Sequence, residues 1–231
     1  MPALCINPCS QIKAILEASD FLPPHNWLIS YLECYDTTGW DGSEKWDSES
    51  LILTDEELKR DVYLRDMQFI WGVFSAIPKE YGREDIGSYQ FPELENPRYM
   101  ANHIVPQHPL AFLEISVWDG CYTYICSHDE ELLSPFYNLP YKVIDVEADN
   151  RIMNRELCRI QDVLRSMTPD VSDVIANEIQ WKCWHLLFRN KKGQVNDRKL
   201  ASKIEHIYRE VSAPGYWFRH KSTIWNPYDQ K

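Results

Sequence analysis

Residues 110–127 read LAFLEISVWDGCYTYICS, and this stretch constrains the fold more than any other part of the chain. Asp119-Gly120 lies between two runs rich in β-branched and aromatic residues, a pattern that predicts a β-hairpin with a two-residue turn. Such a turn pairs Trp118 with Cys121, and the side chains along each strand then alternate between two faces. The face expected to enter the core holds Leu113, Ile115, Val117, Tyr122, Tyr124 and Cys126.

The remaining sequence predicts an α+β fold with an antiparallel-containing sheet that includes this hairpin. Residues 27–35, 67–78 and 141–148 are further strand candidates, and 67–78 is apolar enough to be a buried central strand. Beyond residue 150 the apolar period becomes helical and indicates about three helices. Because no flexible linker separates the two portions, we expect a single domain, 1–231, in which the helical portion 150–231 packs on the α+β portion 1–149.

Two short motifs predict where helices begin. Residues 54–57, TDEE, have the Thr and Glu of a capping box, in which each side chain accepts a hydrogen bond from the backbone N–H of the other residue. Residues 127–130, SHDE, have the same form and predict a short helix that ends near Pro140.

The charge of the chain is unevenly distributed. A net charge of −11 comes from 24 basic and 35 acidic residues. Residues 182–231 hold 11 basic and 4 acidic residues, a balance of +7, which leaves −18 for residues 1–181. An acidic body repels nucleic acid and attracts basic proteins, so we expect a protein partner rather than a nucleic acid.

Cysteine usage and hydropathy indicate the compartment. Seven cysteines, an odd number without paired spacing, favour reduced thiols over disulfides and argue against a structural zinc site. No apolar run is long enough to cross a bilayer, and residues 1–13 do not have the pattern of a secretory signal. We therefore expect a cytoplasmic protein that does not use a membrane; the oligomeric state is left open.

No Walker loop, dinucleotide fingerprint, nucleophile elbow or zincin helix occurs, so we predict no catalytic residue, no metal ligand and no cofactor. A motif-poor metal-dependent hydrolase stays open as an alternative. Asp145 and Glu147 alternate along the expected strand 141–148, and Glu114 lies on a nearby strand. Three carboxylates that converge on one face could hold a metal ion or perform acid–base chemistry.

A second alternative is a nucleic-acid-interacting protein that uses the C-terminal segment 214–231. This segment mixes aromatic rings with positive charge, a composition that suits single-stranded nucleic acid. The same composition suits packing back onto the acidic body, and the charge of residues 1–181 favours this second interpretation.

Two stretches carry a resemblance to a known class of proteins. Residues 69–82, FIWGVFSAIPKEYG, form an apolar strand that ends in a Pro-Lys loop, and residues 109–137 add a strand, a W-D hairpin and a capped helix. Over residues 54–150 this order resembles small uncharacterised bacterial proteins that are similar to the immunity proteins of polymorphic and contact-dependent toxins. The resemblance implies an acidic, aromatic-bearing cytosolic protein that binds a cognate toxin tightly and blocks its active site.

The leading hypothesis is therefore a non-enzymatic immunity protein that binds a basic toxin domain. Acidic side chains steer such a partner, and aromatic anchors supply the desolvated contacts. The first expected contact patch is an acidic loop with Trp40, Asp41, Glu44, Trp46, Asp47 and Glu49. The second expected patch is the first turn of the helix after the hairpin, with Asp129, Glu130 and Glu131.

Overall fold

The computed structural model of the chain describes residues 3–7, 12–36, 45–65, 67–94, 96, 99, 101–119, 122–188 and 195–213. The chain divides into two compact units, Met1–Glu147 and Ala148–Lys231. The boundary lies in the first turn of α4 (Val146–Met167), close to residue 150, where the sequence period becomes helical. A single domain with the helical portion packed on the α+β portion stays a prediction.

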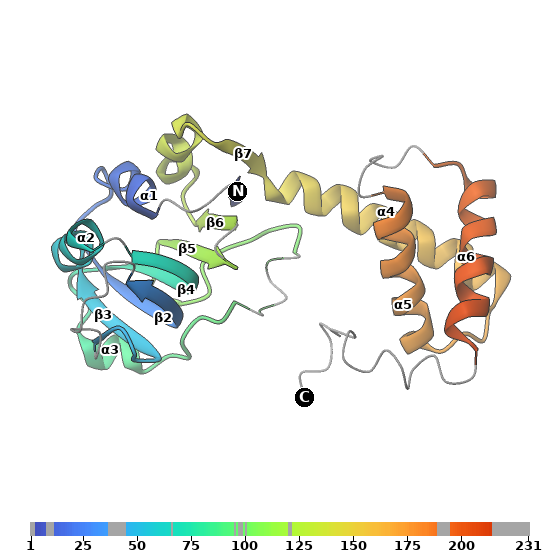
Figure 1. Ribbon diagram of the computed structural model, residues 1–231, viewed down its shortest axis with the longest axis horizontal. Helices are drawn as coiled ribbons and strands as arrows, with labels where there is room; N and C mark the ends of the chain where they lie inside the picture. The colour runs from blue at the N-terminus through green and yellow to red at the C-terminus, as the bar shows by residue number, and fades with distance from the viewer. Residues whose placement is uncertain are drawn as a thin grey trace. The chain divides into compact units, whose positions relative to one another are not determined.

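Within the described residues, unit 1 contains a seven-stranded sheet in the order β3-β2-β4-β5-β6-β1-β7, and every neighbouring pair is antiparallel (Figure 1). The strands are β1 (Ala3–Asn7), β2 (His25–Asp36), β3 (Ser50–Thr54), β4 (Met67–Pro78), β5 (Leu113–Trp118), β6 (Tyr122–Ser127) and β7 (Lys142–Asp145). The helices are α1 (Ile12–Ala18), α2 (Asp55–Leu64), α3 (Arg83–Gly87) and the 3₁₀ helix η3 (Glu130–Asn138). The α+β prediction is confirmed, as are the strands expected at 27–35 and 67–78.

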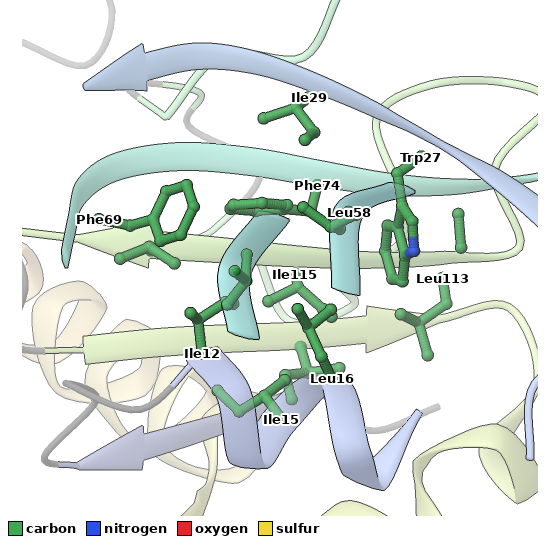
Figure 2. Close-up of a cluster of buried hydrophobic side chains, with 14 of the residues drawn as sticks. Ile12, Ile15, Leu16, Trp27, Ile29, Leu58, Phe69, Phe74, Leu113 and Ile115 are labelled. Atoms are coloured by element: carbon green, nitrogen blue, oxygen red, sulfur yellow. The ribbon is translucent and has the colours of Figure 1, made fainter. Parts of the chain in front are cut away.

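One face of the sheet, the helix face, is covered by α1, α2 and η3. Figure 2 shows Ile12, Ile15 and Leu16 of α1 pointing toward strand side chains that include Leu113 and Ile115. These residues form the largest core cluster, which Trp27 and Phe74 also enter with fully buried rings. Burial of so many aliphatic and aromatic side chains provides most of the driving force for folding this unit.

The opposite face, the loop face, is covered by residues from the connection between β4 and β5 and by Val146 at the start of α4. Tyr99, Ile104 and Val146 pack with the β1 and β6 residues Cys5 and Cys126. A second cluster on the same sheet comprises Leu28, Ile77, Ile86 and Ala111. The sheet is therefore buried on both faces over much of its area.

The hairpin register differs from the prediction by one residue. Trp118 pairs with Tyr122 and Ile115 with Ile125, so three residues, 119–121, connect the strands instead of two. Asp119 has a left-handed φ of 49° at the start of this connection. Because a one-residue shift moves every side chain of a strand to the other face, Tyr124 and Cys126 lie on the loop face. Leu113, Ile115 and Val117 enter the helix-face core as predicted.

Two register shifts interrupt the pairing of β2 with β4, one between Ser30 and Glu33 and one between Glu33 and Cys34. Ser30 pairs with Val73 and Glu33 with Trp71, so β2 has one more residue than β4 over this interval. Tyr31 takes a φ of 52°, a left-handed conformation that is uncommon for a residue with a side chain. Beyond Ser30, Leu32 and Cys34 still pack against the helix-face core, whereas Tyr31 and Tyr35 are exposed.

The helix starts follow local chemistry. The Thr54 side chain accepts from the Glu57 backbone N–H at 3.1 Å, and the Glu57 carboxylate accepts from the Thr54 N–H at 2.9 Å, so the first capping box is confirmed. The second is wrong. Asp129 caps η3 by accepting from the Glu131 N–H at 2.9 Å, while the Ser127 hydroxyl donates to the Phe112 carbonyl oxygen.

Unit 2 contains α4, α5 (Asp173–Cys183) and α6 (Asp197–Val211), and α5 continues as the π-helix η4 (Trp184–Phe188) (Figure 1). The three helices share one core, to which Ile160, Ile179 and Ile204 contribute. Arg159 of α4 donates to the Val195 carbonyl oxygen at 2.6 Å and to the Asp197 carboxylate at the start of α6. The expectation of about three C-terminal helices is confirmed. Within the described residues, no helix is long and apolar enough to span a membrane.

Candidate partner-binding surface

The first expected contact patch is only partly described. Trp40, Asp41 and Glu44 lie outside the described residues. Trp46 is 5% exposed, and its ring packs edge-on against Phe69 in the helix-face core at a centroid distance of 5.8 Å. Trp46 is therefore a core residue and not a surface anchor. Asp47 and Glu49 are exposed just before β3, where side chains can contact a partner.

The strand registers place the two expected patches at opposite ends of the sheet. Ser50, Ser30, Val73, Ser116 and Tyr124 lie in one row across β3, β2, β4, β5 and β6. Asp47 and Glu49 come just before Ser50, the residue with which β3 begins in this row. The second patch, Asp129, Glu130 and Glu131, is exposed but follows the far end of β6. The two acidic patches therefore form two separate surfaces.

The three carboxylates of the hydrolase alternative do not form one group. The sequence predicted Asp145 and Glu147 on one strand, and this is wrong. β7 ends at Asp145 and α4 begins at Val146, so Asp145 is on a strand and Glu147 is on a helix. Asp145 pairs with Leu4, which faces the helix-face core, whereas Glu114 pairs with Cys126 on the loop face. Among the described residues no three His, Cys, Asp or Glu side chains are arranged to hold a metal ion.

Glu114 and Glu147 are buried, and both accept hydrogen bonds from the connection that covers the loop face. Glu114 accepts from the Gln107 backbone N–H at 2.9 Å and from the Tyr99 hydroxyl at 3.1 Å. Glu147 accepts from the Ile104 N–H at 2.8 Å, and His103 Nδ1 lies 3.3 Å from it. These contacts assign the two carboxylates a structural role, which is to hold Tyr99, Ile104 and Gln107 against the sheet.

The thiol and hydroxyl groups beside these carboxylates are not activated. Burial raises the pKa of the Cys126 thiol well above its ordinary value, and the charges of Glu114 and Glu147 raise it further. Burial, together with the charge of Glu114, likewise raises the pKa of the Tyr99 hydroxyl. A nucleophile or a general base requires the opposite shift, so the chemistry of this cluster is that of a packed network.

A group of aromatic side chains gathers at one end of the loop face, at the same end of the sheet as Asp47 and Glu49. We call this group the aromatic strip; it consists of Tyr35, Trp71, Trp118, Tyr122 and Tyr124. Trp118 pairs with Tyr122, and its ring centroid lies 6.2 Å from that of Trp71 and 5.8 Å from that of Tyr124. Tyr35 is 56% exposed and Tyr122 is 40% exposed.

Acidic side chains border the aromatic strip. Glu33 pairs with Trp71 across β2 and β4, and the Tyr35 hydroxyl donates to its carboxylate at 2.9 Å. Asp119 is exposed at the hairpin end beside Trp118. Aromatic rings enclosed by charged side chains are typical of the central contacts of protein interfaces.

The sequence prediction missed the aromatic strip, although part of its signal was available. Glu33 and Tyr35 alternate with Leu32 and Cys34, a period of two that predicts one polar-aromatic face in this half of β2. The contributions of Tyr122 and Tyr124 could not be found, because the two-residue turn assigned both side chains to the core face.

Comparison of the chain with protein-family models, with curated proteins and with solved structures finds no match. The candidate surface is therefore supported by its own geometry and charge.

Proposed function

We propose that this chain is an immunity protein, a cytoplasmic protein that binds a basic toxin domain and occludes its active site. The observation that carries the proposal is the charge of unit 1. Residues 1–147 contain 25 acidic and 9 basic residues, a net charge of −16. Among the acidic residues described in this unit, only Asp61, Glu114 and Glu147 are buried. Most of the negative charge thus lies on the surface, where it accelerates encounter with a basic protein.

The internal ion pairs of unit 1 also support this function. Lys45 pairs with Asp61 at 2.8 Å, and Lys59 lies 2.5 Å from Asp20 and 2.7 Å from Asp55. Basic side chains of the unit are thus engaged with its own carboxylates. The described acids of the two predicted patches are exposed, and the resemblance over residues 54–150 points to the same kind of partner.

The proposal is tested with the product of the reading frame next to this gene. We expect that protein to stop bacterial growth when it is expressed alone, and co-expression of this chain to restore growth. The purified pair should form a complex whose association rate falls as the salt concentration rises. Unrelieved toxicity, or a neighbouring product that neither harms cells nor binds the chain, contradicts the proposal.

The separated acidic patches supply a matched comparison. Two double variants change the net charge equally but at opposite ends of the sheet. The first variant combines Asp47→Lys with Glu49→Lys, and the second combines Glu130→Lys with Glu131→Lys. Asp129 is left unchanged because it caps η3. We expect the first pair to slow association by about tenfold and to flatten its salt dependence, and the second pair to change it by less than about threefold. Equal effects contradict the assignment of the first patch.

A further inference from the structure

The aromatic strip contains an arrangement with a specific chemical preference. Glu33 and Trp71 are direct cross-strand partners, so the carboxylate and the indole project from the same face of the sheet. Tyr35 is two residues farther along β2, on that same face, and its hydroxyl holds the Glu33 carboxylate at 2.9 Å. The hydrogen bond from Tyr35 restricts rotation of the carboxylate, which projects from the same face of the sheet as the indole.

Both groups are accessible to a partner. Glu33 is exposed, Tyr35 is 56% exposed, and Trp71 is half-buried, with its ring in a T-shaped contact with that of Trp118. The contact with Trp118 limits the movement of the Trp71 ring. A ring and a carboxylate that are both positioned before binding lose little conformational entropy when a ligand arrives.

An arginine side chain fits this arrangement better than any other protein side chain. Its guanidinium group is planar, stacks on an indole face, and donates two parallel hydrogen bonds to a carboxylate. A lysine ammonium group has the charge but lacks the plane and the fork of donors. The net charge of −16 on unit 1 concentrates cationic partners at this surface and opposes binding of a nucleic acid.

From this geometry we propose that Glu33 and Trp71 form an arginine-binding site, in which a partner protein places a guanidinium group between the carboxylate and the indole. The inference rests on the proposed function, because it takes the partner to be a basic protein. It goes further by naming the side chain that is recognised and the residues that recognise it.

The test uses two peptides, acetyl-(Arg-Gly)4-amide and acetyl-(Lys-Gly)4-amide, which have equal charge and length, with the full chain. Binding is followed by the indole N–H signals in ¹H–¹⁵N NMR spectra. We expect the arginine peptide to shift the signals of Trp71 and Trp118 and to bind at least fivefold more tightly than the lysine peptide. Equal affinity for both peptides, or shifts that do not include Trp71, overturn the proposal.

Variants locate the site. Glu33→Gln changes an exposed side chain and should lower the affinity for the arginine peptide at least fivefold, as should Trp71→Leu. Tyr63→Leu removes an exposed ring from α2 and should leave the affinity unchanged. Sedimentation of the chain at several concentrations tests self-association; a dimer that Trp71→Leu dissociates would show that a second copy occupies the strip and would overturn the proposal.

Because the peptides replace the toxin, the outcomes for this inference and for the proposed function are separate. If the chain binds the toxin but shows no preference for arginine at Trp71, the arginine-binding site is wrong and the proposed immunity function is unaffected. Arginine preference at Trp71 without toxin binding removes the immunity function and leaves the local recognition.

Discussion

Gln107 donates its backbone N–H to the buried carboxylate of Glu114, and its side-chain amide reaches the same carboxylate at 3.2 Å and the Tyr99 hydroxyl at 2.9 Å. One glutamine of the β4–β5 connection is thus joined to one glutamate of β5 by two hydrogen bonds. Because Glu114 is 1% exposed, the loss of its charge is not compensated by water.

Glu114→Gln should loosen the attachment of Tyr99 and Gln107 to the sheet. The replacement keeps the shape of the side chain but presents an N–H₂ group to donors, so at least one buried hydrogen bond is lost. We expect the free energy of unfolding to fall by about 1–3 kcal/mol in denaturant titrations and the Gln107 amide to exchange faster with solvent. Glu93→Gln, at an exposed side chain, is the control, and equal effects of the two variants contradict the role of Glu114.

His25 should make the stability of the protein depend on pH. Burial lowers the pKa of His25 from its ordinary 6.5, and its Nδ1 contacts the Pro23 carbonyl oxygen at 2.7 Å. The unfolded chain therefore binds a proton at a higher pH than the folded chain. The contribution of neutral His25 is full above about pH 6.5 and is lost as the pH falls below that value.

The measurement is the thermal midpoint between pH 7.5 and 5.5. His25→Asn should have a shallower pH dependence than the unmodified chain, because Asn keeps a donor for Pro23 but does not titrate. His128→Gln, at an exposed residue, is the comparison. A slope that His25→Asn leaves unchanged rules out this residue as the source.

Trp46 should contribute to stability through its ring. Its indole packs on Phe69, and its Nε1 has no hydrogen-bond partner among the described residues. Trp46→Ala should lower the free energy of unfolding by about 3–5 kcal/mol through the cavity it leaves. Trp46→Phe retains a ring and removes the buried N–H, so it should cost less than about 1.5 kcal/mol. Similar costs for both variants contradict burial of the ring.

Two glycines should respond in opposite directions to alanine. A Cβ at Gly72 lies 3.1 Å from the Phe74 ring, which is fully buried in the core and has little room to move. We expect Gly72→Ala to destabilise the protein by about 1–2 kcal/mol. A Cβ at Gly87 meets nothing within 4 Å, and Gly87→Ala should stabilise by about 0.4–1 kcal/mol by restricting the unfolded chain. Chemical denaturation of the two variants measures both values, and a stabilising Gly72→Ala contradicts the close contact.

Local patterns were sufficient for several elements. The TDEE motif fixed the start of α2 because capping depends on residues only three apart, and the apolar run at 67–78 identified β4 by its length and its β-branched and aromatic content. The hairpin strands were identified, but not their register. Register depends on the number of connecting residues, and Asp119-Gly120 favours a two-residue turn while the chain uses three.

Other features depend on contacts that no local pattern contains. Residues 142–147 read KVIDVE, and their alternation fits a strand, yet the chain changes to helix at Val146 and places Glu147 in the first turn of α4. β3 is five residues long and precedes a capping box, so it has little signal of its own. The burial of Glu114 could not be predicted from its own strand, where it has the pattern of a residue on a polar face. The groups that donate hydrogen bonds to it, from Tyr99 and Gln107, belong to a different segment of the chain.

The position of β1 has a consequence for biosynthesis. β1 is the first of the described strands along the chain, but it pairs with β6 on one side and with β7 on the other. A ribosome must therefore release well over a hundred further residues before either partner of Leu4 exists. Until then this apolar segment has neither of its partner strands. During this interval, binding by a holdase chaperone or self-association competes with native folding.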